Sequence, residues 1–186
     1  APITINDISV TEDDHGHDNA ILTVTLSGAV DVPVDVQFDS QDVTAISVDN
    51  SLSGDSDFES VSAGNVRFDG SDGATEQISI RINGDGVVEL DETLNVLLSN
   101  IAAAGREDAI TFAKDTGVVT IENDDSATVS IEQSTSVTEG DSGQANADLI
   151  VTLSAPVDVP VGYSFNSQDG TATLADGDYQ VASGTP

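Results

Sequence analysis

Short segments of alternating apolar and polar residues run along most of the chain, and Gly, Asp, Asn and Ser bound them. This period of two predicts β-strands, because successive side chains of a strand point to opposite faces of its sheet. No segment of useful length has the spacing of an amphipathic helix. The pattern predicts an all-β fold, an antiparallel β-sandwich of seven strands. The predicted strands are Ile3 to Val10, Leu22 to Leu26, Val34 to Phe38, Asn65 to Phe68, Gln77 to Ile82, Thr93 to Leu97 and Val118 to Ile121.

The chain also repeats itself. The 33 residues from Val10 to Asp42 align without gaps on those from Val137 to Asp169, and 21 of the 33 positions are identical. An offset of 127 residues suits whole β-domains joined end to end better than a solenoid repeat. We therefore predict one complete domain over residues 1–125 and a partial second copy over residues 126–186. The second copy has residues for only the first three strands and the loop that follows them.

Carboxylate and amide side chains follow alternate strands of the predicted sandwich. If consecutive strands run antiparallel, the first, third, fifth and seventh strands point the same way, and their C-terminal ends lie together. Four stretches that are far apart in the sequence are therefore predicted to converge at one end of the domain. The polar residues in these stretches are Glu12, Asp42, Asp85, Glu89, Asp91, Glu92, Asn123, Asp124 and Asp125.

The charge balance makes such a convergence costly without a counterion. The chain has 34 acidic and 4 basic residues, a formal net charge of −30, and no basic residue falls in the four stretches. Two like charges about 4 Å apart repel by roughly 4 kcal/mol at an effective dielectric constant near 20. A hard divalent cation would neutralise them, and calcium suits the site better than magnesium because it takes six to eight oxygens in irregular geometry. The competing interpretation is a solvated, solubilising acidic surface.

Other classes of function fit the composition poorly. An acidic surface repels nucleic acid and anionic lipid, no apolar run is long enough to span a membrane, and the absence of Cys excludes disulfides and thiol chemistry. There is no Trp, and no set of nucleophile, base and orienting residue is evident, so an enzyme is not expected. His15 and His17 have the spacing of a transition-metal pair, but a solvated loop is the simpler interpretation.

Several short motifs together resemble one known family. They are SVTE and SVTEGD before the second strand of each copy, LTVTLS, SQDGTATLADGDY in the second copy, LDETLNVLLSN, and the closing VVTIENDD. These motifs cover essentially the whole chain and resemble Calx-beta domains, which occur in sodium/calcium exchangers and in many large bacterial surface and secreted proteins. The resemblance implies an immunoglobulin-like seven-stranded sandwich that binds calcium at its acidic end.

The resemblance also implies a set of ligands. By position these are Glu12, Asp42, Asp85, Glu89, Glu92, Asn123, Asp124 and Asp125, with Val87 contributing its backbone carbonyl. Two positions depart from the pattern, because Gly84 stands where calcium-binding members often have Asp and Asn123 replaces another Asp.

These observations predict a calcium-binding repeat of a large extracellular or cell-surface protein, of which this chain is a fragment. Ions at the end of the first domain would stiffen the junction to the next repeat. The expected partners are calcium ions, neighbouring repeats and, through the open apolar face of the incomplete second copy, another copy of the chain. The alternative is a metal-independent structural or adhesive spacer with a solubilising acidic surface.

Overall fold

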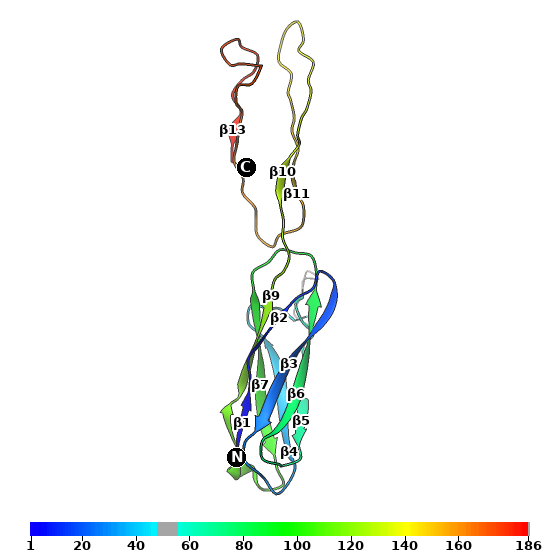
Figure 1. The fold of residues 1–186 in the computed structure, drawn as a ribbon, viewed down its shortest axis with the longest axis vertical. Helices are drawn as coiled ribbons and strands as arrows, with labels where there is room; N and C mark the ends of the chain where they lie inside the picture. Colours follow the sequence, from blue (N-terminus) through cyan, green and yellow to red (C-terminus); the bar gives the residue numbers. More distant parts are fainter. Residues whose placement is uncertain (48–55, 186) are drawn as a thin grey trace. The chain divides into compact units, whose positions relative to one another are not determined.

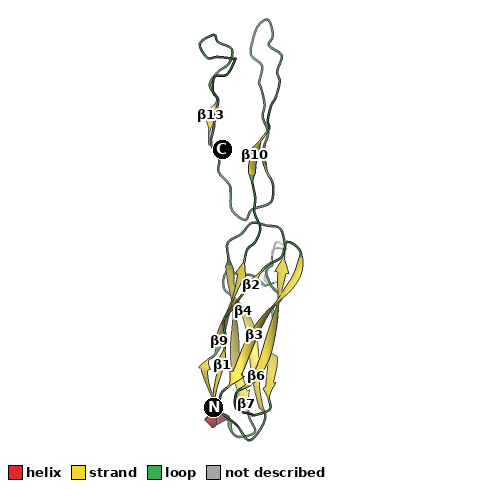
Figure 2. Cartoon of the chain, viewed as in Figure 1, coloured by secondary structure: helices red, strands yellow, loops and turns green. Residues whose placement is uncertain are grey.

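The computed structural model describes residues 1–47 and 56–185. Strands dominate these residues, and their only helix is the short 3-10 turn η1 (Glu107–Ala109) (Figure 2). No helix among them is long and apolar enough to cross a membrane. By its contacts the chain divides into two compact units, Ala1–Pro156 and Val157–Pro186. The repeat boundary between Asp125 and Ser126 stays a prediction from the sequence.

Nine strands of the first unit build a sandwich of two sheets (Figure 1). One sheet has the order β6-β3-β1-β8 and the other the order β2-β9-β7-β4-β5. The strands are β1 (Pro2–Ile5), β2 (Ile8–Thr11), β3 (Gly16–Leu26), β4 (Val34–Asp42), β5 (Gly64–Phe68), β6 (Ala74–Gly84), β7 (Glu92–Ala102), β8 (Thr111–Lys114) and β9 (Thr116–Glu122). The structure has nine strands where seven were predicted, because β1 and β2 divide the first predicted strand and because β8 and β9 are separated only by Asp115. With each of these pairs counted once, the predicted all-β sandwich of seven strands is confirmed.

The first predicted strand, Ile3 to Val10, is wrong as a single element. The chain leaves one sheet at Ile5 and enters the other at Ile8, so β1 pairs with β3 and β8 while β2 pairs with β9. Two side chains stabilise the crossing. Asn6 Oδ1 accepts the Thr23 N–H of β3 at 2.6 Å, and Asp7 Oδ1 accepts the Val118 N–H of β9 at 2.8 Å. The pairs β1–β8 and β2–β9 are parallel, whereas the other pairs of the sandwich are antiparallel.

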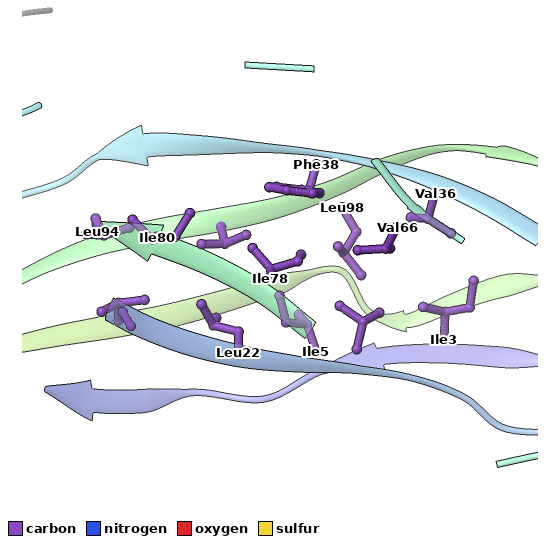
Figure 3. Close-up of a cluster of buried hydrophobic side chains, with 14 of the residues drawn as sticks. Ile3, Ile5, Leu22, Val36, Phe38, Val66, Ile78, Ile80, Leu94 and Leu98 are labelled. Carbon is purple, nitrogen blue, oxygen red and sulfur yellow. The ribbon is translucent and has the colours of Figure 1, made fainter. Parts of the chain in front are cut away.

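Aliphatic side chains from both sheets fill the space between them (Figure 3). The inward positions of β3 are completely or almost completely buried, as the alternation of Leu22, Val24 and Leu26 with Thr residues predicts. Phe58 and Phe68 are the largest fully buried side chains. Burying an apolar side chain of this size contributes roughly 1.5–3 kcal/mol. This packed core holds the ends of the strands in fixed positions.

The second copy forms only short strand pairs. In the first unit β10 (Val129–Ile131) pairs with β11 (Val151–Leu153), and in the second unit β12 (Phe165–Asn166) pairs with β13 (Ser183–Gly184). In the described residues, each of the three strand stretches predicted for this copy contains a strand of only two or three residues. A sheet that has no second layer to pack against gains little from extending its strands.

Candidate metal centre

Parallel pairing of β2 with β9 brings the ends of these strands side by side. Thr11 lies opposite Glu122, and the N–H of the next residue, Glu12, donates to the Glu122 carbonyl at 3.1 Å. Strand β4 runs in the same direction as β9 because both are antiparallel to β7, and the β6–β7 loop begins at the same end. The four predicted stretches therefore meet at one end of the sandwich (Figure 1).

Glu12 is buried at the centre of this end, with only 6% of the residue exposed. Burial is the main reason why its pKa rises from 4.5 to about 7. The negative charges of Asp85, Asp125, Asp57 and Asp124 raise the pKa further. A carboxylate surrounded by carboxylates in a position with little water is unstable in its charged form unless a cation is present.

A second group of carboxylates adjoins Glu12 through Asp57. Asp57, Glu89 and Glu92 each offer an oxygen, and the three oxygens lie within 4.8 Å of one another. All three residues are partly buried. We use the term acidic cluster for the whole set of seven carboxylates, which comprises Glu12, Asp57, Asp85, Glu89, Glu92, Asp124 and Asp125.

Asp57 was missing from the predicted set, although the sequence contains a signal for it. After Asp42 the first copy carries six more residues than the second, and Asp57–Phe58 then aligns with Asp178–Tyr179. The Asp57 side chain reaches the cluster from the segment before β5. The predicted set includes only residues that follow the C-terminal ends of alternate strands, and this segment is not among them. Its Oδ2 also accepts the N–H of Ile46 at 2.5 Å.

Asn123 connects the β6–β7 loop to the end of β9. Its Oδ1 accepts the Glu89 N–H at 3.1 Å, and its Nδ2 donates to the Asp125 carbonyl at 3.2 Å. Its backbone N–H donates to Asp91 Oδ1 at 3.2 Å. These bonds give the predicted ligand Asn123 a role in fixing the positions of Glu89 and Asp125.

The remaining predicted ligands differ in their environments. The Asp42 carboxylate accepts the Ser47 N–H at 3.3 Å and the Ser47 hydroxyl at 3.4 Å, and it lies outside the group formed by Asp57, Glu89 and Glu92. Asp85 Oδ1 accepts the Val87 N–H at 2.7 Å, which makes a tight turn at the start of the loop. That turn uses the amide of Val87 and leaves its carbonyl oxygen for other contacts.

Asp125 carries an atom that a bound cation would satisfy. Its Oδ2 is buried and has no hydrogen-bond partner among the described residues. Burial raises the pKa of Asp125, and the charges of Asp14, Asp124 and Asp85 add to this effect. A buried carboxylate oxygen normally has a donor or a metal ion as its neighbour. The residues present therefore fit a hard cation with oxygen ligands.

Gly84 and His17 lie at adjacent ends of β6 and β3, beside the loop that follows β2. A Cβ placed on Gly84 would lie 1.9 Å from the backbone oxygen of Asp13, so the space of a side chain at this position is taken by the loop that follows β2. The Nδ1 atom of His17 lies 3.1 Å from Asn83 Oδ1 in a hydrogen bond, so this nitrogen of the predicted solvated loop has a partner within the protein.

None of the four Arg and Lys side chains, all of which lie in the described residues, belongs to the acidic cluster. Each of the four pairs with a carboxylate outside it. The pairs are Arg67 with Asp35, Arg81 with Glu59, Arg106 with Asp31 and Lys114 with Asp7. Surface ion pairs of this kind contribute little to stability, typically about 0–1 kcal/mol each. The arrangement can coordinate a cation, whereas a nucleophile or an acid–base pair for catalysis is not evident in it.

The two-sheet fold and the acidic cluster at one end of it define a class of protein, a β-sandwich repeat with a candidate metal site made of oxygen ligands. The sequence model of the Calx-beta domain matches residues 3–124 and again residues 122–185, so the chain belongs to the Calx-beta domain family. Domains of this family act as binding and regulatory modules. No curated protein sequence matches the chain.

Solved structures agree with this fold. The apo form of the Calx CBD1 domain is 22% identical over 67% of this chain and 97% of its own, with a TM-score of 0.51. The tandem CBD12 of CALX1.2 is 20% identical over 67% of this chain and 46% of its own, with a TM-score of 0.53. CBD12 of CALX1.1 is 22% identical over 66% of this chain and 44% of its own, with a TM-score of 0.52. At these identities the similarity shows the fold alone.

Proposed function

We propose that the chain is a calcium-binding repeat module, with the ion or ions held by the acidic cluster. The observation that carries this proposal is the burial of Glu12 among four other carboxylates, none of which forms an ion pair with an Arg or Lys of the described residues. The unpartnered Asp125 Oδ2 supports it, as does membership of the Calx-beta family, in which CBD12 of CALX1.1 is described as a calcium binding domain. Calcium fits such a site because it accepts several carboxylates in irregular geometry.

Thermal unfolding with calcium or with a chelator, at fixed ionic strength, tests the proposal. Ligands that converge only in the folded protein stabilise it by RT ln(1 + [L]/Kd), which is roughly 2.7 kcal/mol when calcium is present at 100 times its Kd. We expect calcium to raise the melting temperature and titration calorimetry to detect uptake by the chain of 186 residues. Equal melting temperatures in millimolar calcium and in chelator would instead support the metal-independent spacer.

Calcium binding is further proposed to stiffen the junction between the two repeats of an extracellular or cell-surface protein. The Asp125 carboxylate directly precedes the second repeat in the sequence. The β6–β7 loop also has a direct bond to that repeat within the first compact unit, because the Val88 N–H donates to the Pro156 carbonyl at 3.0 Å. An ion that fixes the β6–β7 loop would therefore reduce the motion of Val88 and of the Pro156 carbonyl bound to it. Small-angle scattering with and without calcium would measure the change in flexibility.

Self-association of the second repeat is the last part of the proposal. Leu22 and Phe38 of the first repeat are 0% and 8% exposed, whereas the aligned Leu149 and Phe165 are 47% and 43% exposed. Open apolar strands of this kind favour pairing with another chain. We expect sedimentation to detect a concentration-dependent dimer, and a strictly monomeric chain at all concentrations would contradict this part alone.

A further inference from the structure

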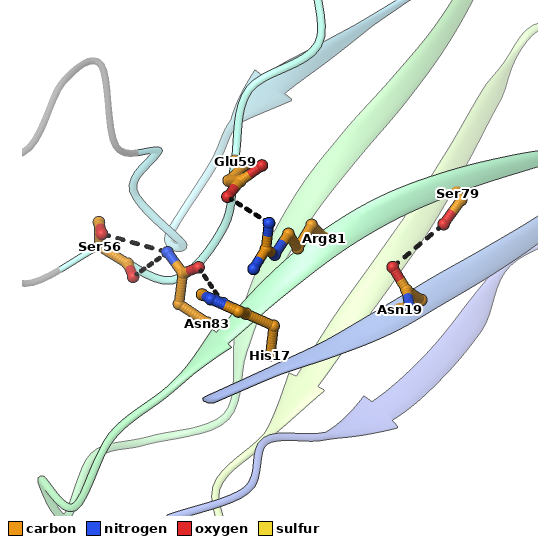
Figure 4. Close-up of polar contacts among 7 residues, drawn as sticks. All are labelled: His17, Asn19, Ser56, Glu59, Ser79, Arg81 and Asn83. Carbon is orange, nitrogen blue, oxygen red and sulfur yellow. Dashed lines mark hydrogen bonds and ion pairs between the residues drawn. The ribbon is translucent and has the colours of Figure 1, made fainter. Parts of the chain in front are cut away.

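Asn83, near the end of β6, connects three segments beside the acidic cluster (Figure 4). Its Nδ2 donates to the Ser56 carbonyl at 2.8 Å and lies 3.2 Å from the Ser56 hydroxyl, while its backbone N–H donates to the Asp57 carbonyl at 2.8 Å. Its Oδ1 lies 3.1 Å from Nδ1 of His17, its register partner in β3. An amide oxygen can only accept, so the proton of this contact belongs to the His17 Nδ1.

These bonds fix the short segment that carries the Asp57 carboxylate. The next residue, Phe58, is completely buried and forms an isolated bridge with Ile82, so the segment extends the edge of β6. The N–H of Ile46 holds the side chain itself through Asp57 Oδ2. Asp57 therefore has its position set by the protein, and a cation would not have to order it.

The second repeat has a residue that aligns with Asp57, and its contacts can be compared with those of Asp57. Asp178 aligns with Asp57, and its Oδ2 accepts the N–H of Thr173 at 2.9 Å, where Thr173 aligns with Ile46. The local sequence thus makes the carboxylate–amide bond in both repeats. No strand equivalent to β6 is present among the described residues of the second repeat, and Asp178 is exposed whereas Asp57 is partly buried. The contacts from Asn83 are what the first repeat adds.

We propose that Asn83, together with His17, is a positioning residue that holds Asp57 in the acidic cluster and thereby increases the affinity of the cluster for calcium. This inference rests on the proposed function, because it concerns the same ion. A loosely held carboxylate loses conformational freedom when it binds a metal, and that loss opposes binding. Mutation of a group that hydrogen-bonds to a metal ligand and fixes its position typically lowers metal affinity by about 10–100-fold.

A matched pair of variants tests the role of Asn83. Ser79 lies on the same strand as Asn83, and its hydroxyl donates to Asn19 Oδ1 of β3 at 3.3 Å (Figure 4). It makes a comparable cross-strand contact that does not reach Asp57. We expect Asn83→Ala to weaken calcium binding by roughly 10-fold in titration calorimetry. Ser79→Ala should leave the affinity unchanged, and both variants should unfold at similar temperatures in chelator.

Two variants of His17 separate positioning from a general loss of packing. His17→Gln keeps a side-chain N–H that can reach Asn83 Oδ1, so we expect it to retain the affinity of the unaltered chain. His17→Phe keeps a ring but has no donor, and it should weaken calcium binding. The luminescence lifetime of bound Eu³⁺, which reports coordinated water, should indicate more water in Asn83→Ala and in His17→Phe than in Ser79→Ala.

The outcomes distinguish this inference from the function on which it rests. Calcium uptake that is equally strong in Asn83→Ala, His17→Phe and the unaltered chain would overturn the inference and leave the proposed function intact. An equal loss in Ser79→Ala would overturn it as well, because the effect would then follow from any cross-strand contact. No calcium uptake by the unaltered chain would overturn both.

Discussion

Replacement of Glu12 with Gln should have opposite effects on stability with and without calcium. The side chain is almost completely buried, and its pKa is raised to about 7 in the folded protein from 4.5. A shift of one pKa unit corresponds to about 1.36 kcal/mol, so ionised Glu12 costs the calcium-free fold about 3 kcal/mol. Gln has nearly the same shape and no charge. Glu12→Gln should therefore stabilise the protein in chelator at about pH 8 by up to that amount.

The sign of the pH dependence follows from the same shift. Because the folded pKa lies above the unfolded value, protonation favours the folded state. The calcium-free protein should gain stability as the pH falls from above 7 towards 4.5, and it should lose this contribution as the pH rises through about 7. Glu12→Gln should remove most of this dependence. In calcium the unaltered chain should be the more stable of the two, because Glu12→Gln lacks one ligand and is stabilised less by the ion.

Thermal unfolding followed by circular dichroism would measure these effects at about pH 5 and about pH 8, with calcium or chelator. A difference of 3 kcal/mol corresponds to a shift of about 10 °C for a domain of this size. Asp108→Asn is the control, because Asp108 is exposed in η1 and such surface changes are usually within about 0.5 kcal/mol. A Glu12→Gln variant that is less stable than the unaltered chain in chelator at about pH 8 would refute this reasoning.

Three further outcomes are expected. Asp57→Asn should weaken calcium binding in calorimetry, whereas Asp42→Asn should change the melting temperature equally with and without calcium, and the reverse pattern would favour the ligand set predicted from sequence. Gly84→Ala should destabilise the first domain in chelator melts, because its Cβ would meet the Asp13 backbone oxygen at 1.9 Å; an unchanged melting temperature would mean that the loop yields easily. The Tyr179 hydroxyl donates to Asp169 Oδ1 at 2.6 Å, and this bond raises the pKa of Tyr179. Asp169→Asn should therefore lower the pKa in an ultraviolet absorbance titration of the tyrosines, and an unchanged titration would show that the bond is not formed in solution.

The alternation of apolar and polar residues determined the class of fold and most of its strands. Leu22, Val24 and Leu26 face inward because side chains of a strand alternate between its faces, and this geometry needs no knowledge of distant residues. The convergence of Glu12 with Asp124 and Asp125 also followed from the sequence, because strand direction alternates along an antiparallel chain. Both conclusions depend only on local geometry and on counting.

The tertiary structure decided which carboxylates share the cluster and what holds them there. Asp57 belongs to the cluster because Asn83 and Ile46 fix its segment, contacts that join residues far apart in the sequence. At Gly84 the Asp13 backbone occupies the space that a side chain would need. Whether a carboxylate is a ligand, a turn residue or a partner in an ion pair depends on burial and on its neighbours across strands. These quantities are properties of the packed sandwich, and no single stretch of the sequence contains them.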